Sequence, residues 1–181
     1  KIMHDFYQVF KYLLYKPVEE GCYAADSIPF ACQHKIGISP EGYPMFFIQT
    51  LGKEKALDIT MEFIKVMFNR SCSIIENNEI RRTHEYTIVS LNAGNVDYQK
   101  YFIDVVCILL HGLSDNVTIK TLKIELMKIA DLFSNLSKPS KKTLQGLWAE
   151  LLVIERSKSP AYLLQSWHLS RNDKFDFNDG I

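Results

Sequence analysis

The sequence has no excess of charge of either sign. Its 21 lysine and arginine residues are balanced by 21 aspartate and glutamate residues. A strongly basic chain is the simplest sign of a nucleic-acid-binding protein, and this chain lacks that sign. A balanced net charge excludes a chain that is basic overall. It does not exclude a basic surface on one part of the protein.

Cysteine is scarce and irregularly spaced. The four cysteines, Cys22, Cys32, Cys72 and Cys107, form no C-x-x-C pair and no Cys/His pattern with zinc-finger spacing. We therefore predict no zinc site and expect reduced thiols in or near the core of a cytoplasmic protein.

Long hydrophobic runs and the common nucleotide-binding motifs are also missing. The longest apolar run, Val105 to Leu110, is far shorter than the roughly 20 residues that span a bilayer, and the first residues lack a signal-peptide pattern. We expect no membrane partner. The sequence contains no GxxxxGKS, GxGxxG or GxSxG motif, which argues against ATP hydrolysis, dinucleotide binding and α/β-hydrolase chemistry.

The composition is that of a folded globular chain. It is 47% hydrophobic and 23% charged, and its 181 residues suffice for one domain or for a domain and part of another. Apolar residues spaced by three and four predict an N-terminal helix that ends before Pro17. These apolar residues are Ile2, Phe6, Val9, Phe10 and Leu13.

The pattern changes to strands between Cys22 and about Phe68. Apolar residues there tend to alternate, and prolines and glycines interrupt the segment. Pro40 to Pro44 predicts a turn between two strands, so we expect an antiparallel meander. A polar loop and a further strand, 84–91, follow. The alternating sets are Ile36/Ile38, Phe46/Ile48 and Leu57/Ile59/Met61/Phe63.

Helical spacing dominates the second half of the chain. We predict helices over residues 98–110, 122–133 and 143–157, and a short helix from 160 to about 167. Thr118 and Ser159 are the predicted N-caps of the second and the last of these helices. The fold class is therefore α+β. The hydrophilic connector SNLSKPSKK is the predicted boundary between an N-terminal domain, 1–137, and a second domain that begins at 138.

Glu150 is the most unusual residue of the 143–157 helix. It borders an apolar stripe, and its neighbours three and four positions away are all uncharged. A carboxylate in such surroundings has a raised pKa or finds a metal, a cation or hydrogen-bond donors elsewhere in the fold. The structural alternative is that Glu150 reaches the rim of the core or pairs with a distant arginine.

The last residues predict the start of a hairpin. Residues 174–177 alternate polar and apolar like a strand, and Asn178-Asp179-Gly180 is a strong turn signal. Because only Ile181 follows, we expect the chain to be the front part of a longer polypeptide. A natural terminus that frays is the alternative. A solvent-facing position on the strand is the simple interpretation of Asp176.

A locally basic zone surrounds these segments. Lys141 and Lys142 precede the helix of Glu150, and Arg171 and Lys174 follow it. Such residues can bind DNA phosphates, although a cluster of this kind is often only a solvated surface.

Several of these residues resemble the motifs of a known family. Gly-Leu-x-x-Glu-Leu on a helix, followed by Trp167 and by Asp176-Phe177, resembles a bacterial family assigned to the PD-(D/E)XK nuclease superfamily. Members carry GLxGEL, a tryptophan, an HDF-like strand and then a strand with Glu-x-Lys. Here Ala149 replaces the second glycine, Phe175 replaces the histidine, and the Glu-x-Lys strand is absent.

The resemblance implies a function and a site. Residues 138–181 would begin a restriction-endonuclease-like α/β core, and the complete protein would be a Mg²⁺-dependent DNA endonuclease from a restriction or phage-defence system. Asp176 and Glu150 would be its catalytic, metal-binding carboxylates. DNA and other restriction or defence proteins would be its partners. Without the Glu-x-Lys strand, the 181-residue chain itself is predicted not to cut DNA.

A rival function comes from a different class. The chain could be a non-catalytic module that binds protein or DNA on a nuclease-like scaffold. In that case Glu150 and Asp176 would only maintain structure, and an ion pair between Glu150 and an arginine of the N-terminal part would favour this alternative.

Overall fold

A computed structural model describes most of the chain: residues 5–18, 20–52, 54–76, 79–80, 83–114, 116–136 and 144–166. Within them, no helix is both long and apolar enough to cross a membrane. The helices are α1 (Phe6–Leu13), α2 (Val96–Gly112), α3 (Ile119–Leu136), α4 (Leu144–Arg156) and α5 (Pro160–Ser166). The strands are β1 (Cys22–Ile28), β2 (Ala31–Ile38), β3 (Pro44–Ile48), β4 (Ile59–Thr60), β5 (Ile64–Glu76), β6 (Glu79–Ile80) and β7 (His84–Leu91).

The main strands pair in a ring, which we call the closed sheet. The order is β1-β2-β3-β7-β5, and β5 pairs with β1 to close it. All neighbours in the ring are antiparallel except β1 and β5, which run parallel with Cys22 opposite Ser73. The short strands β4 and β6 add to β5 outside the ring.

The length and bend of β5 make the closure possible. Its first part pairs with the end of β7, and its last part reaches β1. Between them the register shifts from Met67 to Arg70, and Asn69 has a positive φ of 52°. Asparagine tolerates this left-handed conformation better than most residues, and such a bulge increases the bend of a strand.

The closed sheet has a core on each side of its strands. Its interior is a compact apolar cluster. Gly37 leaves room in this cluster for the aromatic ring of Phe47, since a Cβ at position 37 would lie 2.7 Å from Phe47 Cε2. The outer face of β2, β3, β5 and β7 belongs to the larger core beneath the helices. The interior cluster consists of Ala25, Met45, Phe47, Cys72, Ile74, Tyr86 and Ile88.

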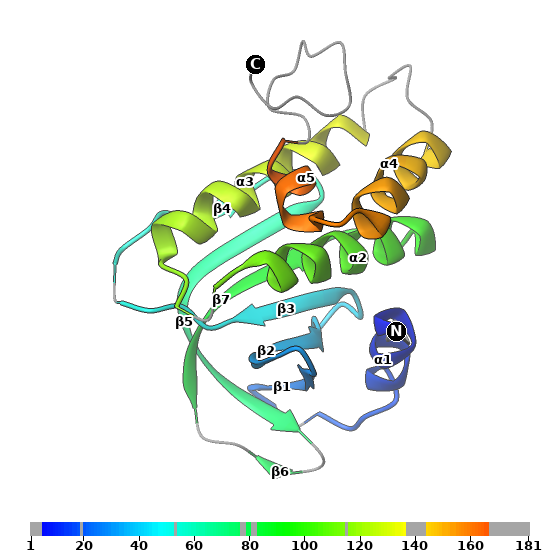
Figure 1. The fold of residues 1–181 in the computed structure, drawn as a ribbon. Coiled ribbons are helices and arrows are strands. Elements are labelled where there is room, and N and C mark those ends of the chain that lie inside the picture. Colours follow the sequence, from blue (N-terminus) through cyan, green and yellow to red (C-terminus); the bar gives the residue numbers. More distant parts are fainter. Residues whose placement is uncertain are drawn as a thin grey trace.

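Helix α2 is the centre of the helical layer (Figure 1). It begins at Asn95, whose Oδ1 accepts hydrogen bonds from the backbone N–H groups of Asp97 and Tyr98. It contacts β3 on the sheet side and α1, α3, α4 and α5 elsewhere. This position explains why buried residues occur all around α2 rather than on one stripe.

The last two described helices pack on α2. Leu151 and Ile154 of α4 and Leu164 of α5 belong to the same buried cluster as the outer face of the sheet. Helix α5 comes very close to the end of α2, because a Cβ added at Gly112 would lie 2.7 Å from the Cβ of Ala161. Glycine at this position therefore permits the close crossing of the two helices.

The observed fold confirms the predicted α+β class and most of its elements. The strand 84–91, the turn between β2 and β3, and the helices over α2 to α5 are all present. Gly42 has a positive φ of 86° in that turn. Thr118 caps α3, since its Oγ1 accepts from the N–H of Thr121 at 3.3 Å.

Other predictions were wrong. The set 57–63 is not one strand: β4 covers two of its residues, and Leu57 is 84% exposed. The polar loop predicted before residue 84 contains most of β5. Helix α3 continues through residues 134–136, which we assigned to the connector. Cys32 is exposed rather than near the core.

Two predictions concern parts that the structure leaves open. The strand at 174–177 lies outside the described residues, as does most of the predicted connector. The domain boundary at 137/138 stays a prediction.

Candidate functional site

Glu150 lies on the buried side of α4. Only 8% of the residue is exposed, and its neighbour Leu151 and the following-turn residue Ile154 are 3% and 0% exposed. Leu152 and Val153 instead face outward, at 43% and 53% exposed. The sequence-based expectation of a carboxylate in apolar surroundings is therefore met. Glu150 is not without a partner in the fold.

Tyr101 of α2 is part of the surroundings of Glu150. It is fully buried, and its ring lies between Trp148 of α4 and Phe133 of α3, at 6.0 and 5.5 Å between centroids. Burial, and then the negative charge of Glu150, raise the pKa of Tyr101 well above its usual value. The phenol is therefore neutral at any physiological pH.

The hydroxyl of Tyr101 has no hydrogen-bond partner within the part of the chain that the structure describes. An unpaired buried hydroxyl is costly, and its presence next to a buried carboxylate identifies Tyr101 as a candidate site residue. Sequence reasoning missed this role, because Tyr101 has the spacing of an ordinary core aromatic in a helical stripe.

The other predicted site residues cannot be placed beside Glu150. Asp176, Lys141, Lys142, Arg171 and Lys174 all lie outside the described residues. Among the described residues, no group of three or more His, Cys, Asp or Glu side chains could hold a metal ion. Asp176, the other predicted metal ligand, lies outside the described residues, so its pairing with Glu150 stays a prediction.

A second set of buried charges lies inside the closed sheet. Lys35 Nζ donates to Glu76 Oε2 at 3.1 Å and to Ser27 Oγ at 2.7 Å. The hydroxyl and backbone N–H of Ser27 donate to Glu76 Oε1 at 2.6 and 3.2 Å. The lysine and glutamate side chains are only 10% and 8% exposed. This network joins β1, β2 and β5 at one end of the ring.

A comparison with family models identifies the chain's relatives. Residues 26–180 match the family described as "Putative PD-(D/E)XK family member, (DUF4420)". The chain belongs to this family. The match includes the closed sheet from Asp26 onward, α4 with Glu150, and Asp176. Membership confirms the resemblance inferred from Gly146 to Phe177 and supports a nuclease-like fold.

Two other comparisons found no match. No curated protein and no solved structure matches this PD-(D/E)XK family member. The assignment of individual residues therefore depends on this chain's own sequence and geometry.

Proposed function

We propose that this PD-(D/E)XK family member forms part of a Mg²⁺-dependent DNA endonuclease of a restriction or phage-defence system. The observation that carries the proposal is the burial of Glu150, 8% exposed, on an apolar helix within the segment that matches the family. A buried carboxylate has to be compensated, and a divalent cation is one group that compensates it.

Glu150 and Asp176 are the proposed metal-binding carboxylates. Mg²⁺ prefers oxygen ligands and is usually held by one or two carboxylates together with water and phosphate. When bound, it would polarise the phosphodiester and lower the pKa of the attacking water. The chain's own contribution is to fix Glu150 in α4, where Leu151 and Ile154 anchor the helix in the core.

Tyr101 is a proposed neighbour of the metal-binding carboxylate. Its phenol stays neutral, so it adds no second negative charge beside Glu150. Its hydroxyl has no hydrogen-bond partner among the described residues, so we propose that it donates to a water or a phosphate oxygen at the site. Lys141, Lys142, Arg171 and Lys174 are proposed to contact the DNA backbone, which carries no sequence information.

A cleavage assay on the full gene product tests the proposal. Supercoiled plasmid should be cut with Mg²⁺ and left intact with a chelator. Glu150→Gln and Asp176→Asn should each lower the cleavage rate by about 100-fold or more, because removal of a ligand should cost at least as much as removal of an outer partner. Glu155→Gln changes an exposed carboxylate on the same helix and should cut like wild type.

The same assay addresses the rival class. If the unmodified gene product retains DNA or a partner protein but shows no Mg²⁺-dependent cleavage, the nuclease proposal is wrong and the interaction module is favoured. If the Glu150→Gln variant cleaved DNA at the wild-type rate, Glu150 would not belong to the metal site.

A further inference from the structure

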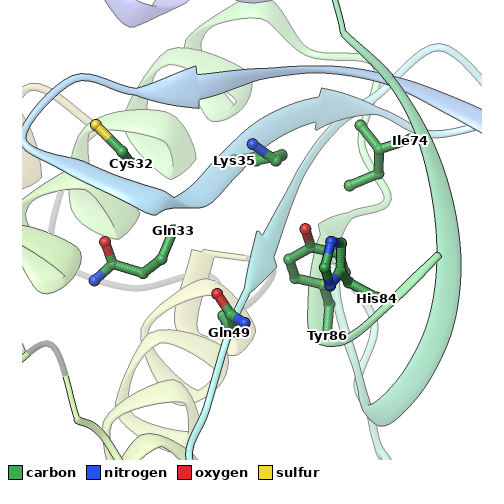
Figure 2. A pocket seen from close by; sticks show the side chains of 7 residues that line it. All are labelled: Cys32, Gln33, Lys35, Gln49, Ile74, His84 and Tyr86. Carbon is green, nitrogen blue, oxygen red and sulfur yellow. The ribbon is translucent and has the colours of Figure 1, made fainter. Parts of the chain in front are cut away.

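One end of the closed sheet contains a cavity of about 160 Å³. Its walls include Gln33, Lys35, Gln49, His84 and Tyr86. Figure 2 shows the two glutamines on one side and Tyr86 with His84 on the other, while Lys35 extends from β2 between them. The strands β2, β5 and β7, together with Gln49 after β3, contribute side chains to this hollow, which is not part of the proposed nuclease site.

The polar side chains stand at positions that face into the ring. Along β2, alternate positions place Gly37, Lys35 and Gln33 on the interior side, and Lys35 pairs in register with Phe47 of the interior core. Met45 and Phe47 of β3 face the interior, and the same alternation places Gln49, just after β3, on the interior side. The side chains on the interior side are therefore apolar in the middle of the closed sheet and polar at the cavity.

The backbone that carries Gln49 is fixed. The N–H of Gln49 donates to Nδ1 of His34, which is 1% exposed on the opposite side of β2, at 3.1 Å. This bond ties the backbone after β3 to β2, while the exposed side chain of Gln49 lines the cavity.

Among the described lining residues, the one lysine is already paired, since Lys35 donates to Glu76 and to Ser27. The other polar side chains of the lining include two primary amides, an imidazole and a phenol, which are groups that can form hydrogen bonds. Such groups match the edge of a heterocycle, and glutamine amides read base edges in many DNA complexes.

The aromatic side of the cavity consists of two rings that stand nearly edge-on to each other. Tyr86 is 4% exposed and packs edge-on against Phe47 at 5.7 Å, and the exposed ring of His84 lies 6.2 Å from Tyr86 with 73° between the ring planes. A cavity of about 150 Å³ accommodates one benzene ring. The observed volume therefore fits a single six-membered ring better than the fused rings of a purine.

From this geometry we propose that the closed sheet binds one pyrimidine base of unpaired DNA in this cavity. The base lies flat on the exposed ring of His84 and meets Tyr86 with its edge, and its polar atoms face the amides of Gln33 and Gln49. This inference rests on the proposed function for its choice of DNA as the ligand, and it adds a base-reading site to that function.

Binding of labelled single strands to the 181-residue chain tests the proposal. The probes are oligothymidylate, oligocytidylate, oligoadenylate and a fully abasic strand of equal length, all compared by fluorescence anisotropy at one salt concentration. The pyrimidine strands should bind about tenfold more tightly than the abasic strand, because stacking on an aromatic side chain contributes this much per base. Oligoadenylate should bind like the abasic strand.

The cavity glutamines should account for this preference. Gln33→Ala and Gln49→Ala should lose the preference for pyrimidine strands, and Gln8→Ala, at an exposed glutamine of α1, should keep it. As a measurement on the unaltered chain, the side-chain amide signals of Gln33 and Gln49 in NMR spectra should move with oligothymidylate and stay still with the abasic strand.

Each outcome decides a specific point. Equal binding of the abasic strand, no binding at all, or an unchanged preference in both glutamine variants would overturn the base site. Equal binding of oligoadenylate would overturn the pyrimidine-sized cavity. Failure of this proposal is separable from failure of the nuclease, since Glu150→Gln should abolish cleavage and leave the base preference intact.

Discussion

Asp104 provides the sharpest test of the helical layer. It is half-buried on α2, with Glu155 of α4 and the α1 cap Asp5 among its charged neighbours. Burial is the main cause that raises the pKa of Asp104 from 3.8 to about 7, and the charges of Glu155 and Asp5 add to it. Lys100, one turn earlier on α2, only partly opposes this effect.

The sign of the effect on stability follows from proton binding. Between pH 3.8 and about 7 the folded protein holds a proton on Asp104 that the unfolded chain has lost, so stability falls as the pH rises through this window. The full change corresponds to an upper limit of about 4 kcal/mol. Partial exposure and solvent screening reduce it, and we expect roughly 2 kcal/mol.

Asp104→Asn replaces the carboxylate with a neutral group of the same shape. The variant should therefore be roughly 2 kcal/mol more stable than wild type at pH 8 and nearly equal to it at pH 4. Urea unfolding followed by circular dichroism at both pH values measures this difference. Glu62→Gln, at an exposed carboxylate before β5, is the control and should show almost no change. A destabilised Asp104→Asn protein at pH 8, or a difference independent of pH, would refute the reasoning.

Three further substitutions test the packing. Gly112→Ala should destabilise the protein by about 1–2 kcal/mol in thermal unfolding, because its methyl group would clash with Ala161. Thr87→Val should raise the free energy of unfolding by about 1 kcal/mol, since the Thr87 hydroxyl is buried with no hydrogen-bond partner in the described residues. Lys35→Met should cost about 3 kcal/mol by leaving Glu76 without its ammonium, and adding Glu76→Met should restore part of that loss.

The helices were predictable because their signals are local. Apolar spacing and the predicted caps Thr118 and Ser159 place α3 and α5 within a few residues of their observed starts. The strand 84–91 is also predictable, since its alternation and the flanking polar residues occur in one short window. Each of these signals concerns neighbours along the chain, which a sequence shows directly.

The closure of the sheet was not predictable from such signals. The middle of β5, from Asn69 to Ser73, is polar and resembles a loop, yet it pairs with β7 and reaches β1. Parallel pairing of Cys22 with Ser73 depends on contacts across some fifty positions of sequence, and no local period encodes it. The inward position of Gln33 and Gln49 follows only after the ring is known.

Glu150 shows the opposite case, in which sequence locates a residue but not its surroundings. The absence of a cation within one helical turn predicted a carboxylate in apolar surroundings, and the 8% exposure shows that Glu150 is buried. Tyr101 comes from α2, about fifty positions earlier, and only the packing of α4 on α2 brings it near.

The two proposed sites are separated by the architecture itself. Glu150 is on α4, which packs on α2, and α2 packs on the outer side of β3. Gln49 follows β3 and lines a cavity on the interior side of the same strand. Substitutions without shared contacts usually have additive effects. The double variant Glu150→Gln/Gln49→Ala should therefore combine the cleavage loss of one with the base-preference loss of the other. Coupling between them would mean that base capture and cleavage depend on one conformational change.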